Sequence, residues 1–206
     1  MYHLKGVSYF YSSHVPKSGE SPCRGGIEIE ELDILPTGIT ALIGPSGSGK
    51  TTLLSLLAGF VRPQTKADGA LTFQGKPMWP SDQRVGKIAF VFQSHLLLSS
   101  GSALLNALQG RIAAGEGLSI EDGARLAETM AALNLIGQDP PLIGKRARQL
   151  SGGEAQRTAI LRALMANPDT ILCDEPTSSL DETNAGLALE ALRKWSSENQ
   201  KPVVWV

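Results

Sequence analysis

The spacing of apolar residues changes character along the chain. Short runs rich in β-branched and aromatic residues are typical of β-strands, and they lie at 7–11, 27–34, 39–43, 70–73, 88–92, 170–173 and 202–206. Segments in which apolar residues recur every three or four positions predict helices, and they lie at 51–58, 120–135, 151–166 and 182–197. Strands that alternate with helices in this way favour an α/β fold with a parallel sheet.

Residues 100–149 differ in composition from the rest of the chain. Alanine and leucine dominate this stretch, and β-branched residues are scarce. A helix is predicted to start at Ser119, because Ser119 and Asp122 have the spacing of a capping box. The apolar residues that recur at helical spacing after it are Ile120, Ala124, Ala127, Ala131 and Leu135. We interpret the stretch as a helical subdomain inserted into a parallel-sheet core.

A glycine-rich segment follows the predicted strand 39–43 and matches the pattern GxxxxGK followed by Ser or Thr: Gly44, Pro45, Ser46, Gly47, Ser48, Gly49, Lys50 and Thr51. Glycines let backbone N–H groups surround a phosphate, and the positive end of the next helix adds to the attraction. Lys50 is expected to reach the β- and γ-phosphates, and the Thr51 hydroxyl to bind Mg²⁺. The alternative is a glycine-rich turn without function, but the strand and helix around it are the context that the motif requires.

Two adjacent acids, Asp174 and Glu175, follow the apolar strand 170–173. The carboxyl end of a parallel strand faces the ligand crevice of an α/β sheet. We expect Asp174 to hold Mg²⁺ through water and Glu175 to polarise the attacking water. The alternative is a solvated acid pair or a helix cap.

Leu150-Ser151-Gly152-Gly153-Glu154 opens another predicted helix. Ser151 is a good cap, and the two glycines leave the helix start bare, which makes it a possible anion site. Taken alone, an ordinary serine cap is the simpler interpretation. A second phosphate site becomes useful if it serves the nucleotide of another copy.

Four segments of the chain, taken in order, resemble the motifs of ABC-family ATPases. They are the phosphate loop, Gln93 after Phe90-Val91-Phe92, the segment 150–154 and Asp174-Glu175. Ser178-Ser179-Leu180-Asp181 is similar to the D-loop of that family. The resemblance covers essentially the whole chain. It implies a P-loop NTPase α/β fold: a parallel-sheet core, an N-terminal antiparallel β subdomain and an inserted helical subdomain. The implied division assigns 1–92 and 167–206 to the β subdomain and core, and 93–166 to the helical subdomain.

The resemblance also implies an ATP-hydrolysing subunit that powers transport through a membrane permease. ATP and Mg²⁺ are the implied cofactors, and a head-to-tail dimer with a second copy or a homologous subunit sandwiches two ATP molecules. Tyr11 is the implied adenine-stacking residue, and Thr52 extends the phosphate site. Gln93 joins Thr51 and Asp174 at the metal and senses the permease. The residues implied to contact the nucleotide of the other protomer are Ser151, Gly152, Gly153, Glu154 and Asp181.

Charge and composition limit the partners. The formal net charge is −1, which gives no reason to expect nucleic acid. Cys23 and Cys173 are too few for a disulfide framework or a zinc motif. The first residues do not form a signal peptide, and no apolar run reaches the ~20 residues of a membrane span. We expect a cytoplasmic protein that is peripheral on the inner or plasma membrane.

The family usually carries a switch histidine after a strand such as 202–206, and this sequence ends at Val206. The expectation is therefore that this form binds ATP and hydrolyses it weakly. Two alternatives stay open: a soluble ABC-type ATPase, or a nucleotide-gated regulatory module without transport. The apolar segment 94–101 after Gln93 is a candidate permease interface, with burial in the helical subdomain as its alternative.

Overall fold

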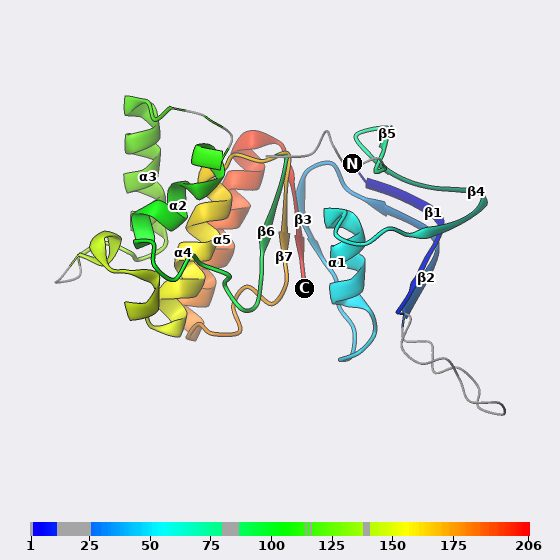
Figure 1. Cartoon of the computed structure of the whole chain (residues 1–206), viewed down its shortest axis with the longest axis horizontal. Helices are drawn as coiled ribbons and strands as arrows, with labels where there is room; N and C mark the ends of the chain where they lie inside the picture. Colours follow the sequence, from blue (N-terminus) through cyan, green and yellow to red (C-terminus); the bar gives the residue numbers. More distant parts are fainter. Residues whose placement is uncertain (1, 12–25, 80–86, 114, 116, 138–140) are drawn as a thin grey trace. The chain divides into compact units, whose positions relative to one another are not determined.

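The computed structural model describes residues 2–11, 26–79, 87–113, 115, 117–137 and 141–206. It forms two compact units, one of residues 1–36 and 42–83 and one of residues 37–41 and 84–206. The predicted loop 12–26 lies almost entirely outside the described residues. Each unit is coloured along the chain in Figure 1.

The first unit combines an antiparallel sheet with one helix. Its strands pair in the order β2-β1-β4-β5, with bounds β1 (Tyr2–Phe10), β2 (Gly26–Ile34), β4 (Gln64–Phe73) and β5 (Lys76–Pro77). Tyr2, Leu4 and Val7 of β1 are buried, and the Tyr2 ring packs on Phe73 with centroids 4.6 Å apart. Helix α1 (Lys50–Ala58) contacts β2 and ends at Gly59, which has a left-handed backbone suited to glycine.

The second unit is a parallel sheet with helices. Its strands lie in the order β3-β8-β7-β6, with bounds β3 (Gly38–Ala41), β6 (Ile88–Val91), β7 (Thr170–Cys173) and β8 (Pro202–Trp205). Its α-helices are α2 (Ala103–Ala113), α3 (Ile120–Ala132), α4 (Gly152–Met165) and α5 (Glu182–Asn199), with short 3₁₀ turns at η1 (Leu142–Gly144) and η2 (Ala147–Gln149). All four residues of β7 are buried, as expected for a central parallel strand.

Helices α4 and α5 pack on the sheet, and α2 and α3 pack on their outer side (Figure 1). α4 contacts β6, and α5 contacts β3 and β8. The core therefore runs from the sheet through α4 to α2. This arrangement confirms the α/β fold with a parallel sheet, an antiparallel sheet and a helical stretch at 100–149.

The buried face of α3 differs from the predicted stripe. Ile120 is 93% exposed, and Ala124, Ala127 and Ala131 are also exposed, so the alanine stripe faces outward. Only Leu135, which follows the helix, is buried as predicted. The buried positions of the helix include Asp122 and Met130. The alanine pattern does not mark a buried face, because alanine adds little apolar area to either side of the helix. Asp122 is buried because it takes part in the helix cap and because its carboxylate lies 2.9 Å from the Arg111 guanidinium.

The two compact units do not coincide with the predicted subdomains. The helical segment 93–166 belongs to the same unit as β6, β7 and β8. The division of the chain into subdomains at 92/93 and 166/167 stays a prediction. None of the helices in the described part of the chain has the length and hydropathy needed to cross a bilayer.

Candidate active site

The phosphate loop precedes α1 within the first unit. Gly47 and Gly49 have φ angles of 79° and 93°, a left-handed backbone that glycine adopts without strain. The Ser48 N–H donates to Pro45 O at 3.2 Å, and the Leu53 N–H donates to Gly49 O at 2.8 Å as the helix begins. No side chain caps this helix start. The glycine-rich bend thus leads directly into an uncapped helix N-terminus, the geometry that binds phosphate.

Lys50 and Tyr11 border the same loop. The Lys50 ammonium donates to Gly44 O at 2.9 Å and to Pro45 O at 3.0 Å, so it lies over the loop. The hydroxyls of Tyr11 and Thr52 are hydrogen-bonded at 2.9 Å. The Tyr11 ring remains 47% exposed beside the first turn of α1. The structure therefore places the predicted aromatic residue next to the predicted phosphate site.

In the second unit, parallel pairing of β6 and β7 brings Gln93 and the acid pair together. Val91 is in register with Cys173, and the Asp174 N–H donates to Val91 O at 2.9 Å. Beyond these strands the Gln93 amide donates to the Glu175 carboxylate at 2.6 Å. Glu175 has a φ of 46°, an uncommon backbone for a residue with a side chain. The candidate base is thus held by the amide that is predicted to serve the metal.

Ser151 starts α4 with a capping box. The Glu154 N–H donates to the Ser151 hydroxyl at 3.2 Å, and the Ser151 N–H donates to the Glu154 carboxylate at 2.8 Å. Lys145 pairs with the other Glu154 oxygen at 3.2 Å. Burial alone would raise the pKa of Glu154, but these hydrogen bonds from Ser151 and Lys145 outweigh it and lower that pKa. The serine cap is therefore present, and its presence does not exclude a further contact with phosphate.

The predicted D-loop lies beside this helix start. A Cβ on Gly153 would be 3.4 Å from Ser179 O, so the two segments lie close together. Asp181 caps α5 by accepting from the Asn184 N–H at 2.8 Å, and this bond lowers the pKa of Asp181. Burial lowers the pKa of Arg157, whereas the negative charges of Glu154 and Asp181 act in the opposite direction and raise it. The residues predicted to act in trans thus form one cluster.

The predicted magnesium ligands are distributed over both units, with Thr51 in the first and Gln93 and Asp174 in the second. The described residues contain no group of three or more His, Cys, Asp or Glu that could hold a metal alone. In nucleotide sites, Mg²⁺ takes one or two protein ligands and completes its coordination with phosphates and water.

Sequence reasoning missed two polar residues near Gln93. Arg162 of α4 donates to Leu96 O at 2.8 Å and to His95 O at 3.0 Å. Asn106 of α2 is fully buried, accepts from the Leu98 N–H at 2.7 Å and donates to Leu98 O at 3.2 Å. Neither contact has a local sequence signature, since Arg162 lies 66 positions from Leu96.

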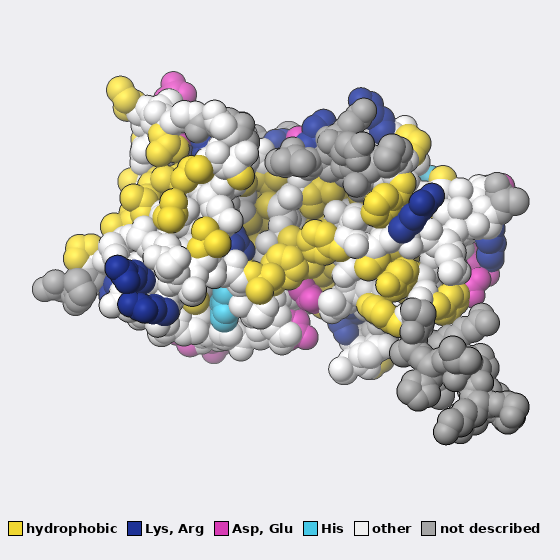
Figure 2. Space-filling view, viewed as in Figure 1, with side chains coloured by type: hydrophobic (Ala, Val, Ile, Leu, Met, Phe, Trp, Pro, Cys, Tyr) yellow, Lys and Arg dark blue, Asp and Glu magenta, His cyan; other side chains and the backbone are white. Residues whose placement is uncertain are grey.

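The apolar segment after Gln93 is divided between core and surface. Leu97 packs against the core, while Leu96 and Leu98 are 56% and 45% exposed. Leu105 on α2 is also exposed, and Figure 2 shows many hydrophobic side chains on the surface of this helical part. The expectation of an exposed surface therefore holds for Leu96 and Leu98, and the alternative of burial holds for Leu97.

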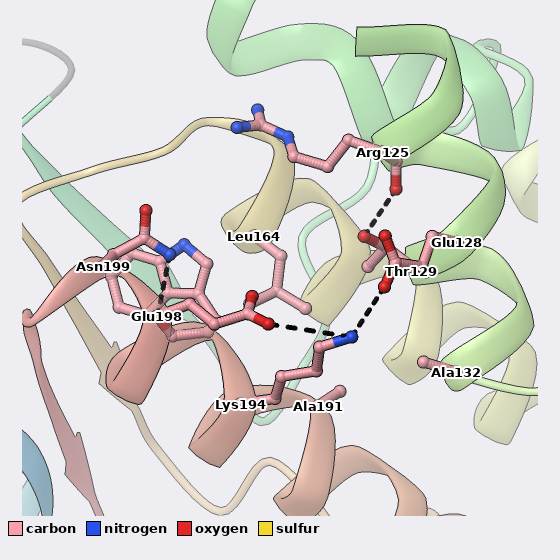
Figure 3. A pocket seen from close by; sticks show the side chains of 10 residues that line it. Arg125, Glu128, Thr129, Ala132, Leu164, Ala191, Lys194, Glu198 and Asn199 are labelled. Carbon is pink, nitrogen blue, oxygen red and sulfur yellow. Dashed lines mark hydrogen bonds and ion pairs between the residues drawn. The ribbon is translucent and has the colours of Figure 1, made fainter. Parts of the chain in front are cut away.

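A separate pocket of about 210 Å³ lies among α3, α4 and α5 (Figure 3). The Lys194 ammonium lies 2.6 Å from a Glu128 oxygen and 3.8 Å from a Glu198 oxygen. Arg125 donates to Met165 O at 2.9 Å. No candidate site residue lines this pocket, and its lysine is paired with acids of the pocket itself. We interpret it as a gap between helices that is bridged by ion pairs.

A phosphate loop, an acid pair at the end of a buried parallel strand and a second serine-capped helix start define a P-loop ATPase of the ABC class. The family model described as "ABC transporter" matches residues 29–178, so the chain belongs to the ABC transporter family. As a member of this family it is a transport ATPase, which confirms the family, the fold and the ATPase activity predicted from the sequence.

Individual relatives support the same family. The lipoprotein-releasing system ATP-binding protein LolD 1 of Rhodopirellula baltica is 36% identical over 203 residues, covering 95% of this chain and 83% of that protein. The molybdenum import ATP-binding protein ModC of Mesorhizobium japonicum is 38% identical over 174 residues, covering 82% of this chain and 44% of ModC. The ATP-binding cassette MJ0796, solved as a dimer in a post-hydrolysis state bound to ADP and Pi, has a TM-score of 0.81 and 31% identity over 100% of this chain and 87% of that one.

Proposed function

We propose that this chain binds and hydrolyses MgATP to power transport of a substrate through a partner permease in the membrane. The observation that carries the proposal is the combination of an uncapped phosphate loop with a base, Glu175, held at the end of a buried strand. The matched relatives are named for lipoprotein release, molybdenum import, taurine import and macrolide export. Such different cargoes support the shared energy-coupling step and leave the substrate to the partner.

We assign one chemical task to each residue around the nucleotide. Lys50 and the N–H groups of the phosphate loop neutralise the β- and γ-phosphates. Thr51, Asp174 and Gln93 hold Mg²⁺ directly or through water. Glu175 orients and polarises the attacking water once Gln93 releases its carboxylate.

The segment 150–154 and Asp181 act on the nucleotide of a second protomer in this proposal. Two phosphate sites in one chain are redundant for one ATP, whereas a head-to-tail pair uses both. The solved relative MJ0796 is described as a dimer, which supports this arrangement. The second protomer is another copy of this chain or a homologous subunit.

Leu96 and Leu98 form the proposed contact with the permease, because they are exposed apolar side chains on a loop adjoining Gln93. A chain that docks there lies on the cytoplasmic face of the membrane without spanning it. Leu96→Asp should abolish recovery of a polytopic membrane protein with the tagged chain in mild detergent, with MgATP binding intact. Recovery with ribosomes, DNA or no partner would favour a soluble ABC-type ATPase instead.

Two substitutions test the catalytic assignment. Glu175→Gln should retain MgATP binding and lose about 10²-fold or more in phosphate release, the usual effect of removing a general base. Lys50→Ala should lose nucleotide binding, measured with a fluorescent ATP analogue. Lys76→Ala is the matched control, since Lys76 is an exposed lysine of the same unit outside the loop. Equal turnover in all three variants would refute the assignment.

A further inference from the structure

The loop after Gln93 has an unusual backbone. His95 and Leu96 have φ angles of 63° and 44°, so two consecutive residues with side chains are left-handed. Such residues prefer negative φ, and no glycine relieves the strain here. The Leu96 N–H closes a tight turn by donating to Ser94 O at 2.7 Å. A turn of this kind persists only when its surroundings hold it.

The guanidinium of Arg162 supplies that hold. Its two terminal nitrogens donate separately to His95 O and Leu96 O, at 3.0 and 2.8 Å. The planar fork of arginine suits two neighbouring acceptors, whereas lysine has a single ammonium. Partial burial of the guanidinium lowers the pKa of Arg162. Asn106 holds Leu98 in the same loop from α2.

Arg162 connects this loop to the other end of α4. The helix begins at Gly152, so Arg162 lies ten positions or roughly 15 Å along its axis. Most residues of α4 between these points are buried, and Gly153 lies close to the D-loop at the helix start. A packed helix moves as one element. A displacement at its start therefore reaches the carbonyls of His95 and Leu96 through Arg162.

We propose that Arg162 is a positioning residue that links nucleotide engagement at Ser151–Glu154 to the conformation of the loop carrying Leu96 and Leu98. The proposal rests on the function assigned above to these two segments. In this proposal the turn has two conformations. His95 and Leu96 are left-handed while Arg162 holds both of their carbonyls, and they relax to negative φ when α4 moves. Because coupling between sites is reciprocal, a partner bound at the leucines changes nucleotide engagement by the same factor.

Hydrogen–deuterium exchange of the full chain tests this linkage with MgATP as the probe. Peptides covering 44–52 report the phosphate loop, and peptides covering 94–98 report the strained turn. In the unmodified chain, MgATP should change exchange in both. In Arg162→Ala, exchange at 94–98 should be about tenfold faster without nucleotide, as expected after loss of hydrogen bonds from a charged donor. In this variant, MgATP should no longer change exchange at 94–98, while it still changes exchange at 44–52.

The control and the possible outcomes separate this proposal from the assigned function. Arg193→Ala removes an exposed arginine of α5 and should respond as the unmodified chain does. A chain whose 44–52 peptides ignore MgATP would refute the assigned function. Responsive 44–52 peptides with an unresponsive 94–98 turn, or an Arg162→Ala turn that responds normally, would overturn the role of Arg162 alone.

A second variant covers the case in which Arg162→Ala does not fold, as judged by its circular dichroism. Arg162→Lys keeps the charge and loses the fork, so the response of 94–98 to MgATP should fall at least threefold. An unchanged response in this folded variant would overturn the proposal. A merely structural role would alter melting temperature but leave the response to nucleotide in place.

Discussion

Ser151 and Ser119 each form a capping box at the start of an α-helix, which allows the role of Ser151 in helix stability to be separated from a role at a nucleotide. Ser151→Ala removes the acceptor of the Glu154 N–H, a bond of 3.2 Å, and leaves the return bond from the Ser151 N–H in place. Ser119→Ala removes the equivalent 3.1 Å bond to the Asp122 N–H at the start of α3. Each loss should lower the free energy of unfolding by about 1 kcal/mol.

This loss of stability cannot by itself reduce activity. A domain with ~5–15 kcal/mol of stability that loses about 1 kcal/mol still has far less than 1% of its molecules unfolded. If the Ser151 hydroxyl also contacts a phosphate oxygen, its removal costs a charge-assisted hydrogen bond of ~1.5–3 kcal/mol, which is roughly a 10- to 150-fold loss. We therefore expect Ser151→Ala to lose at least tenfold in MgATP turnover, and Ser119→Ala to stay within about twofold of the unmodified chain.

Urea denaturation and phosphate release, measured on both variants at the same protein concentration, decide the question. Ser119 is the matched control because it caps its helix from the same position through a bond of similar length, 3.1 against 3.2 Å. The two caps differ in one respect, since the Ser119 hydroxyl also donates to Asp122 at 2.8 Å. Equal stability losses with equal turnover in the two variants would show that Ser151 is an ordinary cap. The proposed second phosphate site would then be wrong.

Three further predictions concern the second unit. Asn106→Ala leaves the Leu98 amide and carbonyl without their partner and should lower the urea-derived free energy of unfolding by about 2–4 kcal/mol. A loss below about 0.5 kcal/mol would show that these two hydrogen bonds do not hold the loop. A hydrogen bond from the Ser119 N–H lowers the pKa of Asp122, so stability present above its unfolded pKa near 3.8 should be lost as pH falls through the lower folded pKa. Asp122→Asn should flatten this dependence in urea titrations between pH 5 and pH 2, and an unchanged slope would contradict the assignment. Burial raises the pKa of the Cys173 thiol, so a Cys23→Ser chain should react with a thiol reagent only after unfolding, and rapid labelling of the native chain would disprove this burial.

Features fixed by neighbouring residues could be predicted from the sequence. The helix starts at Ser119 and Ser151 were predictable because the cap and its partner lie three positions apart. The strand before Asp174 was predictable from a short apolar run, and its acids follow it directly. The phosphate loop was recognisable from the pattern GxxxxGK followed by Ser or Thr, in which Gly47 and Gly49 adopt a left-handed backbone.

Features that depend on contacts between distant residues could not be predicted from the sequence. The positive φ of His95, Leu96 and Glu175 has no local signal, since none is glycine or asparagine. For His95 and Leu96 the contact comes from Arg162, far away in sequence. The exposed face of α3 was also missed, because alanine does not mark a buried side and Asp122 is buried through its pairing.

The adjacency of β6 and β7 has a consequence for how this protein can diverge. The whole helical segment leaves the sheet after β6 and returns at β7, and both ends of that excursion are fixed by backbone hydrogen bonds: Asp169 N–H to Lys87 O at 2.7 Å and Asp174 N–H to Val91 O at 2.9 Å. Substitutions, insertions and deletions within the excursion therefore do not shift the strand register beneath Glu175. A lineage can therefore remodel α2 and α3, which carry none of the residues assigned to ATP hydrolysis, while the paired strands keep the backbone beneath Glu175 in place.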